Sequence, residues 1–339
     1  MKCAIYYNNK DIRLEEIPVP AVGENELLVK MRACGICGSD VLEWYRVKKA
    51  PLVLGHEMTG EIAVTGTRVR TYHAGDRVFV SHHVPCNTCK YCLRGHHTVC
   101  DTLRSTNFDP GGFAEFIRVP AINVDRGVFL LPHEVSYEQG TFIEPLACVL
   151  RGQKIVRLQP GQSVFILGAG ISGLLHLKLA KALGAGSVCI ADIHQERLHF
   201  AEKFHATAAF LSDNHVPEHL KAANNGHLAD VVIVAAGSVE AMSMAWKTVD
   251  RGGTVLLFAP LEPGIDVPIP FFDLWHDGIT ITSTYAGAPI DITEAIELIR
   301  SRNVVVDDMI TDRLPLARVS EGFALVEQAR ESLKVIIKP

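Results

Sequence analysis

The segment Ser163–Gly173, with the sequence SVFILGAGISG, decides the fold class of this chain. Its first five residues form a largely apolar run with the length of a buried strand. Gly168, Gly170 and Gly173 then follow in the spacing G-x-G-x-x-G at the start of a helical stretch. Because the glycines come directly after a predicted strand and open a predicted helix, the segment predicts a dinucleotide-binding turn.

The sequence on either side of this segment indicates two kinds of domain. Further apolar strands are predicted at 187–191, 230–235, 254–258 and 279–283, with a helix at 240–249. Strands that alternate with helices predict an α/β unit with a doubly wound parallel sheet. Residues before about 140 read instead as short β-segments broken by glycine and proline, which predicts a β-rich, barrel-like domain. The tail adds a helix at 292–299 and a strand at 334–337, and periodicity alone does not place that strand.

Each part of the glycine-rich turn has a physical reason to contact a dinucleotide. Gly168 permits the tight turn, Gly170 lets the backbone approach a pyrophosphate, and Gly173 lets helix and strand pack closely. Ile171 and Ser172 begin the predicted helix, whose N-terminus presents free N–H groups and a positive dipole end to the phosphates. These five residues are therefore candidate cofactor-binding residues.

Asp192 is the candidate for cofactor choice, because it ends the second predicted strand about twenty residues further on. A carboxylate there accepts hydrogen bonds from the adenosine ribose hydroxyls and repels a 2′-phosphate, which favours NAD over NADP. Arg197 is also placed on the cofactor side, but it lies several residues into the next helix and is not expected to reverse this preference. The alternative interpretation is an ordinary glycine-rich turn with a helix-capping aspartate.

Four of the nine cysteines lie close together in the pattern C-x-x-C-x-x-C-x7-C: Cys86, Cys89, Cys92 and Cys100. Four thiolates close a tetrahedron around Zn²⁺ and leave no open position, so the pattern predicts a structural zinc site. The alternatives are two disulfides or an iron–sulfur cluster. Disulfides are disfavoured because the number of cysteines is odd, the chain is large and no export signal precedes it.

A second group of candidate ligands is dispersed along the sequence. Cys37 and Ser39 belong to GICGSD at 35–40, His56 and Glu57 to GHE at 55–57, and Glu144 to EPLA at 144–147. Each has an ordinary structural interpretation alone, but cysteine, histidine and carboxylate together suit a catalytic zinc with an open position. Four further histidines flank the four-cysteine lobe and are interpreted as surface or local structure: His82, His83, His96 and His97.

Composition and charge exclude several other classes of protein. The 339 residues are 48% hydrophobic and 21% charged, which is enough to fill two cores. The formal net charge is −5 and the basic residues are scattered, which argues against nucleic acid or a membrane surface as partner. No apolar run could span a bilayer, and the N-terminus lacks the apolar core of a signal peptide. A cytoplasmic protein that acts on a small molecule is therefore expected.

Taken together and in this order, the motifs resemble the zinc-dependent medium-chain dehydrogenase/reductase family over nearly the whole chain. The resemblance is closest to the polyol branch, which includes sorbitol, threonine and butanediol dehydrogenases, because Glu144 stands where the alcohol-dehydrogenase branch has a cysteine. It implies a GroES-like catalytic domain over 1–149 and 285–339, with the structural zinc lobe at about 85–101. It also implies a Rossmann NAD-binding domain over 150–284, a cleft between the two, and a homodimer or homotetramer.

The resemblance implies two zinc ions per chain and an NAD-dependent activity. The catalytic zinc would bind Cys37 and His56, with Glu57 or Glu144 as exchangeable carboxylates. It would lower the pKa of the alcohol, and Ser39 would relay the proton while hydride passes to NAD. A polyol, sugar, cyclitol or amino alcohol is the expected substrate.

One position departs from the family pattern. Leu42 stands where members often carry a histidine that completes the proton relay, so the exit of the proton beyond Ser39 stays open. The alternatives to a dehydrogenase are a biosynthetic carbonyl reductase and a non-catalytic dinucleotide-binding protein of the same fold.

Overall fold

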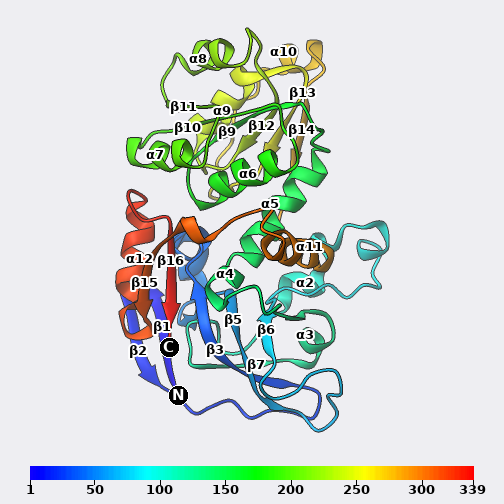
Figure 1. The fold of residues 1–339 in the computed structure, drawn as a ribbon, viewed down its shortest axis with the longest axis vertical. Coiled ribbons are helices and arrows are strands. Elements are labelled where there is room, and N and C mark those ends of the chain that lie inside the picture. Colours follow the sequence, from blue (N-terminus) through cyan, green and yellow to red (C-terminus); the bar gives the residue numbers. More distant parts are fainter. The chain divides into compact units, whose positions relative to one another are not determined.

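The computed structural model describes residues 1–339, which form two compact units (Figure 1). The first unit contains Met1–Ala147 and Gly287–Pro339, and the second contains Cys148–Ala286. The chain therefore leaves the first unit once and returns to it at the C-terminal end. None of its helices is both long enough and apolar enough to cross a membrane.

The second unit is built on a six-stranded sheet in which every neighbouring pair is parallel. Its order is β11-β10-β9-β12-β13-β14, which numbers 3-2-1-4-5-6 within the unit. The strands are β9 (Ser163–Leu167), β10 (Ser187–Asp192), β11 (Ala208–Leu211), β12 (Ala229–Val234), β13 (Val249–Leu257) and β14 (Thr280–Ser283). This is the Rossmann order, and it reverses between β9 and β12, where such sheets bind their ligands.

Helices cover both faces of this sheet because successive strand residues point in opposite directions. Phe165 and Leu167 of β9 pack into a core with α8 and α9, whereas Ile166 faces the start of α6. The helices of the unit are α6 (Ile171–Ala182), α7 (Gln195–Lys203), α8 (Val216–Ala223), α9 (Val239–Thr248) and α10 (Phe271–His276). The strand β11 escaped sequence analysis because it is short and only half-buried.

The first unit contains a mixed seven-stranded sheet and a separate three-stranded sheet. The larger sheet has the order β15-β16-β3-β5-β6-β8, with β7 also paired to β3, and the smaller has the order β2-β1-β4. The strands are β1 (Lys2–Asn8), β2 (Asp11–Glu16), β3 (Leu27–Gly35), β4 (Leu52–Val53), β5 (Glu57–Thr65), β6 (Arg77–Val80), β7 (Phe116–Val119), β8 (Val128–Leu130), β15 (Ile310–Pro315) and β16 (Lys334–Lys338). The dense glycine and proline punctuation thus does mark a β-rich domain.

Short helices connect these strands, and a longer one leads out of the unit. They are α1 (Glu43–Arg46), α2 (Asp101–Ser105), α3 (Ala121–Arg126), α4 (Tyr137–Gly140), α5 (Ile143–Ile155), α11 (Pro289–Arg300) and α12 (Val319–Gln328). The helix α5 begins in the first unit and continues into the second.

The last strand of the chain completes the larger sheet of the first unit. Ile336 and Ile337 of β16 pair antiparallel with Gly35 and Cys34 of β3. On its other side β3 pairs with β5, so β3 lies between the C-terminal strand and the strand that begins at Glu57. This arrangement brings residues from both ends of the sequence to one place, directly beside Cys37.

Candidate metal and cofactor sites

The four cysteines of the lobe converge on a common centre. Their Sγ atoms lie 3.9 Å apart between Cys86 and Cys92, and 3.6 Å apart for both Cys89–Cys92 and Cys86–Cys100. A tetrahedron with Zn–S distances of 2.3 Å has edges of about 3.8 Å. A disulfide would need about 2.0 Å. The four sulfurs are therefore spaced for one Zn²⁺ ion and not for disulfides.

The local backbone prepares one of these thiols for a metal. Hydrogen bonds from Thr88, and then from the N–H of Cys89, lower the pKa of Cys86 to about 5. Because metals bind the thiolate and not the thiol, a lowered pKa favours metal binding at neutral pH.

The second candidate cluster lies at the adjoining ends of β3 and β5. Cys37 follows β3, His56 precedes β5, and Glu57 is the first residue of β5. The potential ligand atoms of these three residues lie within 4.8 Å of one another. The pairing of β3 with β5, in which Gly35 lies opposite Glu57, explains why motifs twenty residues apart meet here.

Negative charge converges on His56. Its Nδ1 lies 3.3 Å from Oδ1 of Asp40, a carboxylate that is completely buried. Burial lowers the pKa of His56, but Asp40 and Cys37 outweigh it and raise the pKa well above its ordinary value. A carboxylate that binds one ring nitrogen commonly orients the other toward a metal. Such a concentration of anionic groups and one imidazole fits a divalent cation.

Glu57 is only partly available to such a cation. Its Oε2 accepts a hydrogen bond from Nζ of Lys334, the first residue of β16, and both side chains are fully buried. Its Oε1 is buried and has no hydrogen-bond partner. Lys334 therefore neutralises Glu57, while one unpaired oxygen is left in the cluster.

Ser39 lies in this cluster as expected, and an arginine holds it there. Its Oγ is 3.4 Å from Sγ of Cys37 and accepts a hydrogen bond of 2.9 Å from Nη2 of Arg46. Nε of Arg46 also donates to the carbonyl of Ser39, and Nη2 lies 3.3 Å from Asp40. Sequence analysis missed Arg46, although it lies only four residues beyond Leu42. A guanidinium stays protonated, so Arg46 positions Ser39 and does not replace the missing histidine as a proton acceptor.

Glu144 is not part of the three-residue cluster. It is the second residue of α5 and its side chain is half-buried.

Two histidines that were interpreted as surface or local structure instead lie at the cluster. The ring centroid of His82 lies 4.9 Å from that of His56, with the two rings tilted by 49°, and 3.8 Å from that of His83. The interpretation holds for His96, which is exposed. Sequence periodicity does not reveal which side of a loop returns to a site, and this is why His82 and His83 were missed.

The glycine-rich turn after β9 has the form that close approach requires. Gly168 adopts a φ of 107°, and a Cβ atom on Gly173 would collide with the carbonyl oxygen of Gly168. A Cβ atom on Gly170 would meet nothing within 4 Å, so open space lies over this residue. Ile171 and Ser172 begin α6, and their N–H groups therefore face the same end of the helix. The turn can hold a phosphate group.

Asp192 ends β10 and fixes the turn through its carboxylate. Oδ2 accepts a hydrogen bond of 2.7 Å from the N–H of Ala169, and Oδ1 accepts one of 2.9 Å from the N–H of His194. Arg197 is 5% exposed; burial lowers its pKa, and the charge of Asp192 opposes this shift. Arg197 is thus buried in α7 next to a carboxylate, which makes it a poor partner for a 2′-phosphate.

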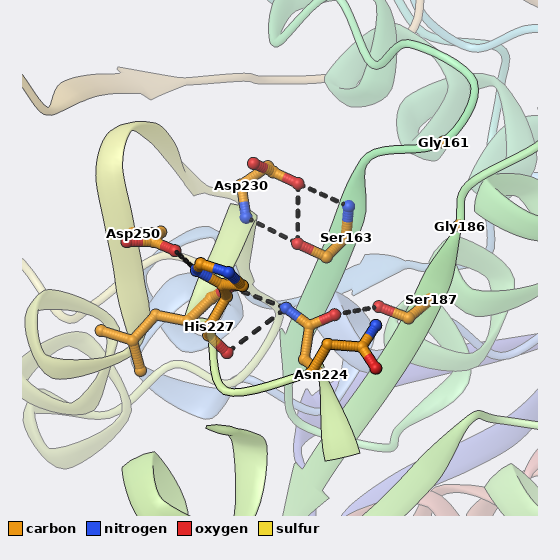
Figure 2. Close-up of a pocket in the computed structure, with 10 residues that line it drawn as sticks. Gly161, Ser163, Gly186, Ser187, Asn224, His227, Asp230 and Asp250 are labelled. Carbon is orange, nitrogen blue, oxygen red and sulfur yellow. Dashed lines mark hydrogen bonds and ion pairs between the residues drawn. The ribbon is translucent and has the colours of Figure 1, made fainter. Parts of the chain in front are cut away.

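A separate cavity of about 450 Å³ lies where the strands of the parallel sheet begin, at the end opposite the glycine-rich turn (Figure 2). Its polar groups are occupied with one another: Asp230 binds Ser163, Asn224 binds Ser187, and His227 lies 3.5 Å from Asp250. It lies at the amino ends of the strands, whereas Rossmann sheets bind ligands at the carboxyl ends. We therefore assign no role to it.

Comparison with known proteins supports both parts of the fold. Residues 23–129 match the family model "Alcohol dehydrogenase GroES-like domain", and residues 172–301 match "Zinc-binding dehydrogenase". The sorbitol dehydrogenase of Bacillus subtilis is 32% identical over 100% of this chain and 97% of that protein.

Solved structures of polyol dehydrogenases have the same fold over their full length. The 2R,3R-butanediol dehydrogenase of Bacillus subtilis superimposes with a TM-score of 0.87 at 25% identity, covering 100% of this chain and 99% of that one. The galactitol-1-phosphate dehydrogenase of Escherichia coli gives a TM-score of 0.88 at 26% identity, with complete coverage of both chains. The expected combination of a GroES-like domain with a Rossmann domain is confirmed.

Two glycine substitutions separate the fold of the turn from its binding function. Gly173→Ala should lower the melting temperature, because the new Cβ atom collides with backbone. Gly170→Ala should leave the melting temperature unchanged and weaken NADH binding by at least about tenfold, because the methyl group occupies the space where the backbone approaches the pyrophosphate. Calorimetry and NADH fluorescence titration measure the two effects. Unchanged NADH affinity in Gly170→Ala would contradict the assignment of this turn to the cofactor.

Proposed function

Because the chain belongs to the zinc-dependent medium-chain dehydrogenase/reductase family, we propose that it transfers hydride between a secondary alcohol of the polyol class and NAD. The observation that carries this proposal is the cluster of Cys37, His56 and Ser39, in which metal ligands and a hydroxyl group lie together. The polyol dehydrogenases among its relatives support a polyol, sugar, cyclitol or amino alcohol as the substrate.

Two zinc ions per chain fit the two donor sets. Cys86, Cys89, Cys92 and Cys100 would hold the structural ion, and Cys37 and His56 would hold the catalytic one. When bound, the catalytic zinc supplies a Lewis acid that lowers the pKa of the alcohol, and NAD accepts the hydride. The chain's own part is to position the substrate and to move its proton.

Ser39 takes the proton-relay role in this proposal. Its Oγ accepts a hydrogen bond from Arg46 and donates one to Sγ of Cys37, so its own hydrogen is directed toward the candidate metal ligand. The carboxylate of Asp40 holds the ring of His56 in its orientation through Nδ1. With Leu42 in place of a relay histidine, the proton passes from Ser39 to water or to the cofactor ribose.

We assign the carboxylate role at the catalytic zinc to Glu144, with Glu57 as the group that exchanges with it. Lys334 already neutralises Glu57, which weakens its attraction to a cation. One thiolate and one carboxylate balance the charge of Zn²⁺, whereas a second free carboxylate would reduce its Lewis acidity.

Isotope transfer tests the reaction itself. Polyols, sugars, amino alcohols and cyclitols that reduce NAD should, when deuterated at the reacting carbon, deliver deuterium to the nicotinamide. Cys37→Ala should lower kcat/KM by about a thousandfold, because Lewis-acid stabilisation of several kcal/mol is lost. Cys189→Ala is the matched control, because burial raises the pKa of that thiol to about 11 and it lies far along the chain in β10. NADH that forms without the label would refute hydride transfer from that carbon.

Cofactor preference depends on Asp192. Wild-type protein should use NAD more efficiently than NADP. Asp192→Asn should lower the ratio of kcat/KM with NAD to kcat/KM with NADP by about tenfold or more, because a charged hydrogen bond to the ribose is lost. The asparagine keeps one oxygen for the N–H of Ala169, so the melting temperature reports any damage to the turn. A wild-type preference for NADP would show that the ribose argument is wrong.

A homodimer formed through the second unit is the oligomer that we propose. The strand β14 is an open edge of the six-stranded sheet, and large apolar side chains are exposed on it and on α10: Ile281, Phe271, Phe272 and Trp275, at 40%, 69%, 68% and 67%. Open edges and apolar patches of this kind are typically covered by a partner.

Light scattering on Ile281→Lys tests this assembly. The wild type should have the mass of a dimer, and the variant that of a monomer, because a charge at the sheet edge blocks strand pairing. Val64→Lys, at an exposed apolar position of the first unit, is the control and should keep the wild-type mass. A monomeric wild type would contradict the proposal.

A further inference from the structure

The loop that follows β6 carries an imidazole to the candidate catalytic cluster. The ring centroid of His82 lies 4.9 Å from that of His56, 3.8 Å from that of His83 and 6.5 Å from that of Phe108, whose ring is nearly perpendicular to it. His82 is not one of the grouped metal-ligand candidates, which are Cys37, His56 and Glu57. His82 therefore lies next to the candidate metal ligands without being one of them.

Two side chains of α3 donate hydrogen bonds to the backbone of this loop. Asn123 is completely buried, and its Nδ2 donates hydrogen bonds of 3.0 Å to the carbonyls of both Ser81 and His82. Arg126 donates to the carbonyls of Pro85 and Cys86, where the loop enters the four-cysteine lobe. A side chain whose backbone is fixed on both sides has little freedom to swing away, which suits a residue that recognises a ligand.

The two ring nitrogens of His82 differ in their surroundings. A neutral imidazole offers one N–H donor and one acceptor nitrogen. Nδ1 is buried without a partner, whereas the side chain as a whole is partly exposed. A proton on Nδ1 would be a buried donor without an acceptor, so the proton belongs on Nε2.

Packing alone does not account for this imidazole. A phenylalanine would fill the same volume beside Phe108 and His56 without leaving a polar nitrogen unpaired. A monohydric alcohol offers His82 no partner, but a polyol bound through one hydroxyl carries a second one on the next carbon. Hydroxyls both accept and donate hydrogen bonds, so they suit an imidazole nitrogen.

We propose that His82 is a specificity-determining residue, whose Nε2–H donates a hydrogen bond to the substrate hydroxyl next to the reacting carbon. This inference rests on the proposed function and deepens it, because it names the residue that makes the site select vicinal polyols over simple secondary alcohols. A site built to bind a hydroxyl discriminates strongly against an analogue that lacks it.

Two probe substrates that differ only in the vicinal hydroxyl test the proposal: 2,3-butanediol and 2-butanol. The wild type should have the higher kcat/KM for the diol. His82→Phe should lower the ratio of the two kcat/KM values by about tenfold or more, since one hydrogen bond is lost. His82→Gln, whose amide reaches the position of Nε2, should keep the ratio within about threefold of the wild type, and the shorter His82→Asn should not. His73→Phe changes an exposed histidine of the same unit and should alter neither value.

The outcomes separate this inference from the function on which it rests. If the wild type oxidises neither 2,3-butanediol nor 2-butanol but does reduce NAD with another polyol, the inference is overturned and the proposed function stands; if no polyol, sugar, cyclitol or amino alcohol reduces NAD, the proposed function fails as well. If His82→Phe lowers kcat/KM equally for both probes, His82 has a structural role. If His82→Phe changes kcat/KM for neither probe, His82 has no role. Either result overturns the inference. If His82→Phe loses its zinc or its melting transition, the other two variants provide the test. The inference then requires that His82→Gln keep the diol-to-alcohol ratio of kcat/KM and that His82→Asn lower it.

Discussion

Lys334 and Glu57 form an ion pair that is wholly buried, between residues 277 positions apart in the sequence. They meet across β3 because Gly35, which lies between their strands, has no side chain to separate them; a Cβ atom there would collide with both. Removing one member of such a pair leaves an uncompensated buried charge and typically costs about 3–5 kcal/mol. The pair thus ties the C-terminal strand to the site and sets the charge that Glu57 can offer to a metal.

The remaining charges of the site follow from this constraint. With Glu57 neutralised, the anionic groups that face His56 are Cys37 and Asp40, and Arg46 lies against Asp40. Burial alone raises the pKa of Asp40, but His56 and Arg46 hold it below the ordinary value. A divalent cation would complete this arrangement, and the same arginine holds Ser39, the residue that we propose relays the proton. Metal binding, orientation of His56 and placement of the hydroxyl are therefore parts of one hydrogen-bonded network.

Local patterns predicted much of this molecule, and long-range contacts account for what was missed. The turn at Gly168–Gly173 and the four-cysteine lobe were predicted because all their parts lie close together in the sequence. The partnership of Glu57 with Lys334 was not, because no periodicity states which strand the C-terminal segment joins. His82 was assigned to local structure for a similar reason: its role depends on a loop that returns to β5. Arg46 was missed because the sequence does not show that α1 turns its last residue back onto Ser39, seven positions earlier.

We propose that the cluster of Cys37 and His56 holds a catalytic metal distinct from the one in the four-cysteine lobe. Anomalous scattering at the zinc absorption edge, from crystals of active protein, measures this directly. We expect two peaks per chain, one at the centre of the four cysteines and one in contact with Cys37 and His56. The second should have the Glu144 carboxylate as a ligand or one water molecule away, while Glu57 keeps its contact with Lys334. A single peak, in the lobe alone, from fully active protein would contradict the account.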